Sequence, residues 1–159
     1  MGVPNGPFDL ELITRTKELI STYKGRYFNT LLMNSLLSLI VLPQQYNSRQ
    51  RNLTFMNEEL ALIKQLDFIL NSPNFHFDPR GYKNDLKNLL NRIRNGIAHQ
   101  HIQVIGKNHK WDTIIIEDIN KYGQVGLHLE LSIKELKTLA FYIGDEYISA
   151  VQPPQTPVL

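Results

Sequence analysis

The stretch LKNLLNRIRNGIAH, residues 86–99, decides the fold class of this chain. Its apolar residues extend a stripe that recurs every three or four positions, which is the spacing of one face of an α-helix. The members of this stripe are Tyr82, Leu86, Leu89, Leu90, Ile93 and Ile97. The pattern predicts a long amphipathic helix from Pro79 to about Gln100, with its apolar face packed in a core.

Helical spacing also occurs on the N-terminal side of this segment. Residues 9–43 predict one or two helices, with a break at Gly25 and an end at the proline in position 43. Residues 57–72 predict a further amphipathic helix, for which Asn57 is the expected N-cap. The polar residues between these two regions predict an exposed loop.

On the C-terminal side the period of the apolar residues changes to two, which is the period of a β-strand. The alternating apolar residues are Ile102, Val104, Ile114 to Ile116, Leu127, Leu129 and Leu131. They predict a small β-hairpin. Ser132 and Glu135 follow with the spacing of a capping box, which predicts the start of a last helix.

These elements predict a mainly all-α fold: a four- to five-helix bundle with a small β-hairpin inserted before the last helix. The length of 159 residues suits one domain, which we assign to residues 8–150. Prolines are frequent in residues 1–7 and 152–159, so we expect these two segments to be flexible tails.

Composition excludes several classes of protein. A hydrophobic fraction of 42% with 20% charged residues is typical of a globular chain rather than a disordered one. The absence of cysteine excludes a disulfide framework, a thiolate metal site and a cysteine nucleophile. The most apolar stretch, residues 31–42, is too short to cross a bilayer, and no signal-peptide pattern is visible. We therefore expect a cytoplasmic protein without membrane contact.

The residues best suited to chemistry lie at the end of the predicted long helix. In the run Arg94-Asn95-Gly96-Ile97-Ala98-His99, Asn95 and His99 are one helical turn apart on the same face, and Arg94 lies on its flank. Cleavage of a phosphodiester needs a group that moves a proton near neutral pH and a positive group that holds the phosphate. Imidazole and guanidinium supply both, so the predicted reaction needs no metal and no other cofactor.

One such helix provides a single histidine, whereas attack by a 2′-hydroxyl needs both a proton acceptor and a proton donor. A second copy of the chain across a two-fold axis would supply the other, which predicts a homodimer. Glycine within a helix costs about 1 kcal/mol relative to alanine. We therefore expect Gly96, with Ala98, to allow the close approach of another backbone.

The run from residue 89 to residue 99 resembles the signature of the HEPN superfamily (higher eukaryotes and prokaryotes nucleotide-binding), in which an arginine is followed by a polar residue and then by a histidine. The resemblance implies a helical bundle whose two protomers bring their motifs into one cleft. It also implies metal-independent endoribonuclease activity that leaves a 2′,3′-cyclic phosphate, in a toxin, antiviral defence or stress role. Arg94 would hold the phosphate, Asn95 would orient it, and His99 would be the acid or base.

The partners expected on this basis are RNA, a second copy of the chain, and an antitoxin or regulatory protein. Six further basic side chains are weaker candidates for RNA contact, near the motif or in the loops: Arg92, His101, Arg49, Arg51, Lys107 and Lys110. Because some HEPN proteins are inactive, the alternative function is a non-catalytic dimer that binds a nucleotide or a partner protein.

Each motif residue also has a structural alternative. His99 could act only as a cation that complements the C-terminal end of a helix. Arg94 could be a solvated side chain or an ion-pair partner of Glu59 or Asp85. His99 and His101 could ligate a metal, although the sequence shows no further ligands at a suitable spacing.

Overall fold

The computed structural model of the chain describes residues 8–26, 28–46 and 53–151. Two groups of predictions therefore lie outside the described residues. These are the flexible tails at residues 1–7 and 152–159 and the two loop arginines, Arg49 and Arg51.

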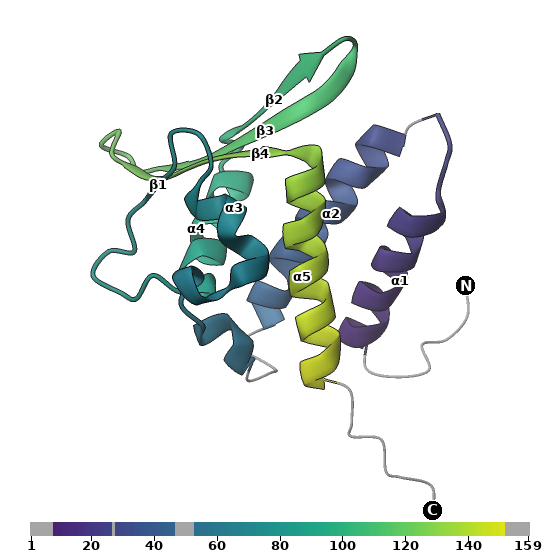
Figure 1. The fold of residues 1–159 in the computed structure, drawn as a ribbon, viewed down its shortest axis with the longest axis horizontal. Coiled ribbons are helices and arrows are strands. Elements are labelled where there is room, and N and C mark those ends of the chain that lie inside the picture. The colour runs from purple at the N-terminus through teal and green to yellow at the C-terminus, as the bar shows by residue number, and fades with distance from the viewer. Residues whose placement is uncertain (1–7, 27, 47–52, 152–159) are drawn as a thin grey trace, which may run out of the picture.

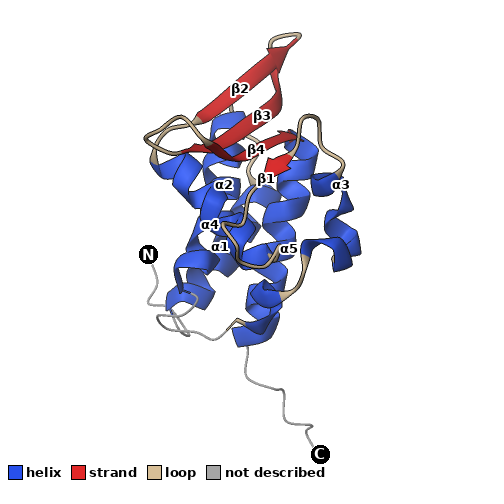
Figure 2. Cartoon of the chain, turned by 90° about the vertical axis from the view of Figure 1, so that its left-hand side faces the viewer, coloured by secondary structure: helices blue, strands red, loops and turns tan. Residues whose placement is uncertain are grey.

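The described residues form a layer of helices packed under a β-sheet, as Figures 1 and 2 show. The longer helices are α1 (Phe8–Thr22), α2 (Phe28–Tyr46), α4 (Leu86–Ala98) and α5 (Ile133–Val151). Shorter helical turns are η1 (Thr54–Asn57), η2 (Leu60–Leu62), η3 (Lys64–Leu66) and α3 (Asp67–Leu70). The strands are β1 (His76–Phe77), β2 (Ile102–Lys107), β3 (Lys110–Ile119) and β4 (Val125–Ser132).

The prediction of an all-α bundle with a small inserted hairpin is wrong. The strands form a four-stranded antiparallel sheet in the order β1-β4-β3-β2. The alternating segment at residues 127–131 pairs with β3 on one side, where Ile116 lies opposite Leu129, and with β1 on the other, where His76 lies opposite His128. A strand with one apolar face needs both a layer to cover that face and partners for its backbone groups, so this segment completes a sheet layer.

The core lies between the sheet and the helices. Ile114 and Ile116 of β3 are at most 1% exposed and point toward the helices, together with the alternate leucines of β4. From the helical side, Ile93 of α4 and Leu139 of α5 are fully buried. The predicted capping box of α5 is confirmed, because the Ser132 and Glu135 backbone N–H groups each donate to the other residue's side chain, at 2.9 and 3.1 Å.

The long helix starts later than its apolar stripe predicts. Helix α4 begins at Leu86, where the Asp85 carboxylate accepts the backbone N–H of Asn88 at 2.9 Å and caps the first turn. Upstream, Arg80 and Gly81 have φ values of 55° and 77°, in the left-handed region that a right-handed helix excludes. The predicted start at Pro79 is therefore wrong by about two turns.

The helix predicted over residues 57–72 is also wrong, because the structure places short turns there. Its local hydrogen bonds close only short turns, and part of its backbone pairs with the segment before α4: Leu60 N–H donates to the Asn84 carbonyl at 2.9 Å, and Leu86 N–H donates to the Glu58 carbonyl at 3.0 Å. Helix α2 also differs from its prediction, because it continues past the expected end at residue 43 and reaches Tyr46.

Gly96 allows a close approach within the chain itself. A Cβ atom at this position would lie 2.5 Å from the backbone oxygen of Glu117 in β3. The close contact that we expected with a partner backbone is thus made by β3, which packs directly on α4.

Replacing Gly96 with alanine is expected to lower the free energy of unfolding by about 1–3 kcal/mol, because the backbone of β3 must move to admit the methyl group. Helix propensity alone predicts the opposite, a gain of about 1 kcal/mol. Urea denaturation of the wild type and the alanine variant shows whether the free energy of unfolding falls or rises. An alanine variant that is more stable than the wild type would contradict the proposed packing of α4 on β3.

Candidate functional site

The end of α4 is a tight turn that determines where the motif residues lie. The His101 N–H donates to the Gly96 carbonyl at 2.8 Å, and the Gln100 N–H donates to the Ile97 carbonyl at 3.1 Å. Gln100 has a φ of 61°. This pattern is a Schellman motif, which glycine usually completes, so the sequence carries no clear signal for it. The chain reverses within one residue and runs directly into β2.

The three predicted catalytic residues lie at this end of α4. Arg94 donates from Nη2 to the Asn95 Oδ1 atom at 3.2 Å, and Asn95 donates from Nδ2 to the Asp118 Oδ2 atom at 3.4 Å. Arg94 and Asn95 are half-buried, whereas His99 is exposed. Asn95 and His99 line the same open pocket, as expected from their shared helix face. Arg94 lines an adjoining pocket, and Asn95 borders both.

Arg92 occupies a different position from the one expected for an RNA contact. Its guanidinium is buried and forms an ion pair with Asp118, with Nη1 and Oδ2 2.8 Å apart and the two side chains 8% and 7% exposed. The other two guanidinium nitrogens donate to the backbone oxygen of Asp78 at 3.0 and 2.7 Å. Arg92 therefore joins α4 to the sheet and to the loop before α4.

Asp118 is a site residue that the sequence analysis missed. It is 5% exposed and accepts hydrogen bonds from both Arg92 and Asn95. A signal was present, since Asp118 continues the inward-facing series of Ile114 and Ile116, where a charged residue is out of place unless it is paired. The resulting chain of contacts runs from Arg92 through Asp118 and Asn95 to Arg94.

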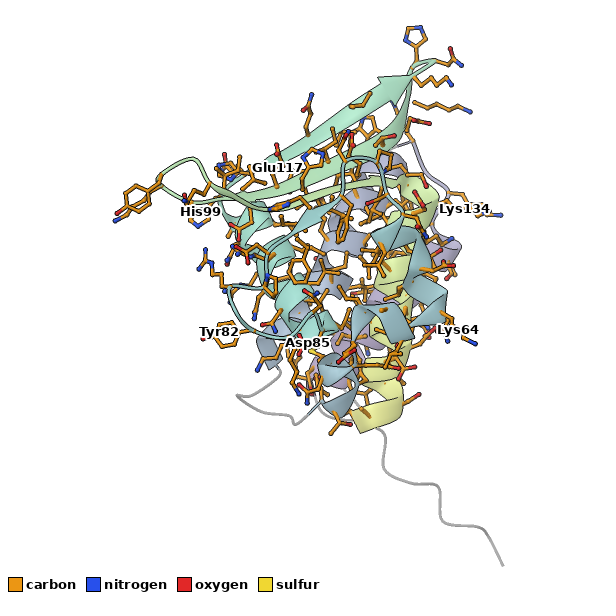
Figure 3. All side chains as sticks on the ribbon, turned by 60° about the vertical axis from the view of Figure 1, so that its left-hand side comes forward. Lys64, Tyr82, Asp85, His99, Glu117 and Lys134 are labelled. Atoms are coloured by element: carbon orange, nitrogen blue, oxygen red, sulfur yellow. The ribbon has the colours of Figure 1, made fainter. Side chains whose placement is uncertain are left out.

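Two exposed cations on separate loops border the pocket that holds Asn95 and His99. Arg80 comes from the loop before α4 and Lys121 from the turn between β3 and β4. Arg80 also borders the pocket that Arg94 lines, beside the exposed Tyr82. Figure 3 shows His99 and Tyr82 on the same side of the molecule. No local pattern identifies these two cations, because only the tertiary fold brings their loops together.

The remaining basic candidates separate into two groups. His101 lines the pocket with His99, and the centroids of the two imidazole rings are 6.2 Å apart. Lys107 and Lys110 lie opposite each other at the tip of the β2–β3 hairpin, which projects beyond the helices in Figure 1. Neither lysine borders a described pocket with His99 or Arg94.

A polar cluster occupies the face of the sheet that points away from the helices. His128 Nδ1 lies 3.0 Å from Glu117 Oε2, and His128 Nε2 lies 3.5 Å from Glu130 Oε2. Burial lowers the pKa of His128, but the hydrogen bonds and charges of the two glutamates outweigh it, so the pKa lies above its ordinary value. Glu117 thus pairs with His128, while the Glu117 backbone contacts α4.

A histidine whose pKa is raised by folding stabilises the protein fully at pH values below its unfolded pKa, and this contribution is lost as the pH rises through the folded pKa. Replacing Glu117 with glutamine should therefore reduce the free energy of unfolding more at about pH 5.5 than at about pH 8.5. Urea denaturation at both values measures the difference. Asp112→Asn, which changes an exposed acid on the same strand, is the matched control. An equal loss at both values would contradict the ion pair.

Within the described residues, no group of three or more histidine and carboxylate side chains is placed to hold a metal ion. In the same part of the chain, no helix combines the length and apolar character that crossing a membrane requires.

Comparison with known proteins places the chain in a family. A family model described as HEPN pEK499 p136 matches residues 1–153. No curated protein and no solved structure matches the chain. The family match supports a nucleotide-binding or ribonuclease type of function. Since it covers the helix with Arg94, Asn95 and His99 and every described element around it, the chain belongs to the HEPN pEK499 p136 family.

Proposed function

We propose that this protein is a metal-independent endoribonuclease of the HEPN type, with Arg94, Asn95 and His99 as its catalytic residues. The observation that carries the proposal is the arrangement at the end of α4. Asn95 and His99 border one open pocket, and the Arg94 guanidinium is hydrogen-bonded to Asn95 at the edge of that pocket. The His99 imidazole is exposed to solvent, and Asn95 links the pocket that holds it to the guanidinium of Arg94.

The proposed reaction is an internal transesterification. The 2′-oxygen forms a bond to the adjacent phosphorus, the bond from phosphorus to the 5′-oxygen breaks, and the products are a 2′,3′-cyclic phosphate and a 5′-hydroxyl. His99 transfers a proton during this exchange, and Arg94 stabilises the charge that builds on the non-bridging oxygens. Asn95 orients the phosphate through its amide. Arg80 and Lys121 are suited to contact the neighbouring phosphates, because both border the pocket.

The active form in this proposal is a homodimer. The outward side of α4 carries Asn88, Asn91 and Asn95, which border open pockets in the single chain. Packing of two protomers near this face would bring two copies of the motif into one composite cleft. A toxin or antiviral defence role, controlled by an antitoxin or regulatory protein, is part of the same proposal.

The direct test is incubation of the purified protein with end-labelled RNA in EDTA. A matched RNA carries a 2′-deoxy nucleotide on the 5′ side of each cleaved bond. We expect cleavage of the first RNA with 2′,3′-cyclic phosphate ends, and none at the deoxy positions, because the attacking hydroxyl is missing. Cleavage at deoxy positions, or cleavage lost in EDTA, would contradict the proposed chemistry.

A second function is favoured by the two cations of the pocket. Arg80 and Lys121 could hold the phosphates of a free nucleotide without any reaction. In that case several RNAs would remain uncleaved, while calorimetry with nucleotides would show binding that Lys121→Ala weakens.

For the ribonuclease, Lys121→Ala should weaken RNA binding mainly at low salt. One lost phosphate contact is expected to reduce the slope of log K against log salt concentration by about 0.7 for a single strand. Fluorescence anisotropy with a 2′-deoxy RNA measures this slope without cleavage. Lys64→Ala is the matched control, since Lys64 is an exposed lysine on the side of the molecule opposite His99 (Figure 3). Equal slopes for the two variants would show that Lys121 does not contact the RNA.

A further inference from the structure

The proposed reaction needs two proton-transfer groups, and helix α4 carries only one exposed histidine in the motif. The tight turn at the end of α4 supplies a second histidine to the same pocket. His99 and His101 both border it, and both side chains are exposed. The pocket measures about 640 Å³, which is within the range of sites that accept a nucleotide-sized ligand.

The turn is what makes this arrangement available. In a continuing helix, residues two positions apart point in nearly opposite directions. Here Gln100 takes a left-handed conformation, with φ 61°, and reverses the chain between the two histidines. Their ring centroids are 6.2 Å apart, and the ring planes are inclined by 36°. The two rings are therefore neighbours on the wall of one pocket, close enough for a single phosphate group in that pocket to contact both.

The charged groups around the pocket leave the imidazoles as its proton carriers. Arg80 and Lys121 are cations from the two loops. The Asp118 carboxylate is buried and engaged by Arg92 and Asn95. The Glu117 carboxylate, on the same strand, pairs with His128 on the opposite face of the sheet. Histidine is also the side chain whose ordinary pKa allows it to give and take protons near neutral pH.

We propose that His101 is the second proton-transfer residue of the active site and works with His99 of the same chain. One imidazole takes the proton of the 2′-hydroxyl as the bond from oxygen to phosphorus forms. The other, protonated, gives its proton to the 5′-oxygen as the bond from phosphorus to that oxygen breaks. This inference rests on the proposed ribonuclease function. Its consequence is that each of the two motif copies in the composite cleft carries its own acid–base pair.

The test compares wild type, His99→Ala and His101→Ala on two substrates: ordinary RNA, and RNA whose 5′-oxygen at the cleaved bond is replaced by sulfur. A thiolate leaves without protonation, so the sulfur substrate needs no general acid. On ordinary RNA we expect His101→Ala to lower kcat by about 100-fold or more and to remove one limb of the bell-shaped pH profile. On the sulfur substrate, the variant that lacks the general acid should recover cleavage activity, and the variant that lacks the general base should not.

The matched control is His109→Asn, at the tip of the β2–β3 hairpin. Asparagine tolerates the φ of 60° at that position, and the variant should cleave like the wild type. Because His101 is exposed, its replacement should not disturb folding, and His101→Gln gives a second variant that keeps the size of the side chain.

The outcomes separate this inference from the function on which it rests. If wild type cleaves and His99→Ala does not, but His101→Ala keeps both the rate and the full pH profile, the inference fails and the ribonuclease proposal stands. If both variants, or neither of them, recovered cleavage activity on the sulfur substrate, the proposed acid–base pair of His99 and His101 would also be overturned. If wild type cleaves neither substrate, both proposals fail.

Discussion

Replacing His99 with alanine is expected to lower RNA cleavage by about 10²–10⁴-fold, the usual contribution of a proton-transfer residue. The fold should not change. The His99 side chain is exposed, and the contact that it makes in the helix end is through its backbone N–H, which donates to the Asn95 carbonyl at 3.0 Å and is retained in alanine. The free energy of unfolding should therefore stay within about 0.5 kcal/mol of the wild type.

Two measurements on the same samples test this expectation. Initial rates on a labelled RNA give the loss of activity, and urea denaturation shows whether the fold is intact. His109→Asn is again the control, because it removes an exposed histidine that lies on the hairpin and not in the pocket. A folded His99→Ala protein that cleaves RNA at the wild-type rate would overturn the ribonuclease proposal. A helix-end cation would then be the remaining role for this residue.

The largest expected effect on stability comes from the buried ion pair behind the site. Asp118→Ala leaves the Arg92 guanidinium buried without its carboxylate, and removing one partner of such a pair typically costs about 3–5 kcal/mol. For a domain of this size, a loss of that order lowers Tm by roughly 2–4 °C per kcal/mol. Because Asn95 donates to the same carboxylate, the variant should also cleave RNA more slowly at temperatures where it remains folded.

Asp118→Asn and Asp112→Ala make this prediction specific. Asparagine keeps an oxygen that can accept from Arg92 and Asn95, so we expect a smaller loss than with alanine. Asp112 is an exposed acid on the same strand, and its replacement should change stability by less than about 0.5 kcal/mol. Urea denaturation of the three variants gives the order of their free energies of unfolding. If Asp118→Ala were as stable as Asp112→Ala, the pair would not join α4 to the sheet.

Features set by neighbouring residues could be predicted from the sequence. The period of three to four residues in the stripe from Leu86 to Ile97 identified α4, and the spacing of Ser132 and Glu135 identified the start of α5. The motif residues Asn95 and His99 were expected on one helix face, and they do border one pocket. The family could also be recognised from this short run, because the motif lies within a single helix.

Features that depend on distant parts of the chain could not be predicted in this way. Strand β1 has only two residues, His76 and Phe77, and it exists because β4 offers a free edge to it. The residues expected to form a helix after Asn57 are instead held by hydrogen bonds to the segment before α4, which overrides their helical periodicity. The same pattern of apolar residues suits both a continuous helix and a series of short turns, so the local sequence does not decide between these two structures.

The candidate site shows the same division. Sequence alone determined that a guanidinium, an amide and an imidazole lie at the end of one helix, because 3.6 residues per turn places them there. Only the tertiary structure decided that Arg92 is buried against Asp118, that Gly96 meets β3, and that His101 returns to the pocket of His99. These contacts join residues across a chain reversal or between a helix and a strand. Their energies come from burial and pairing in the assembled fold, which no periodicity within one segment can encode.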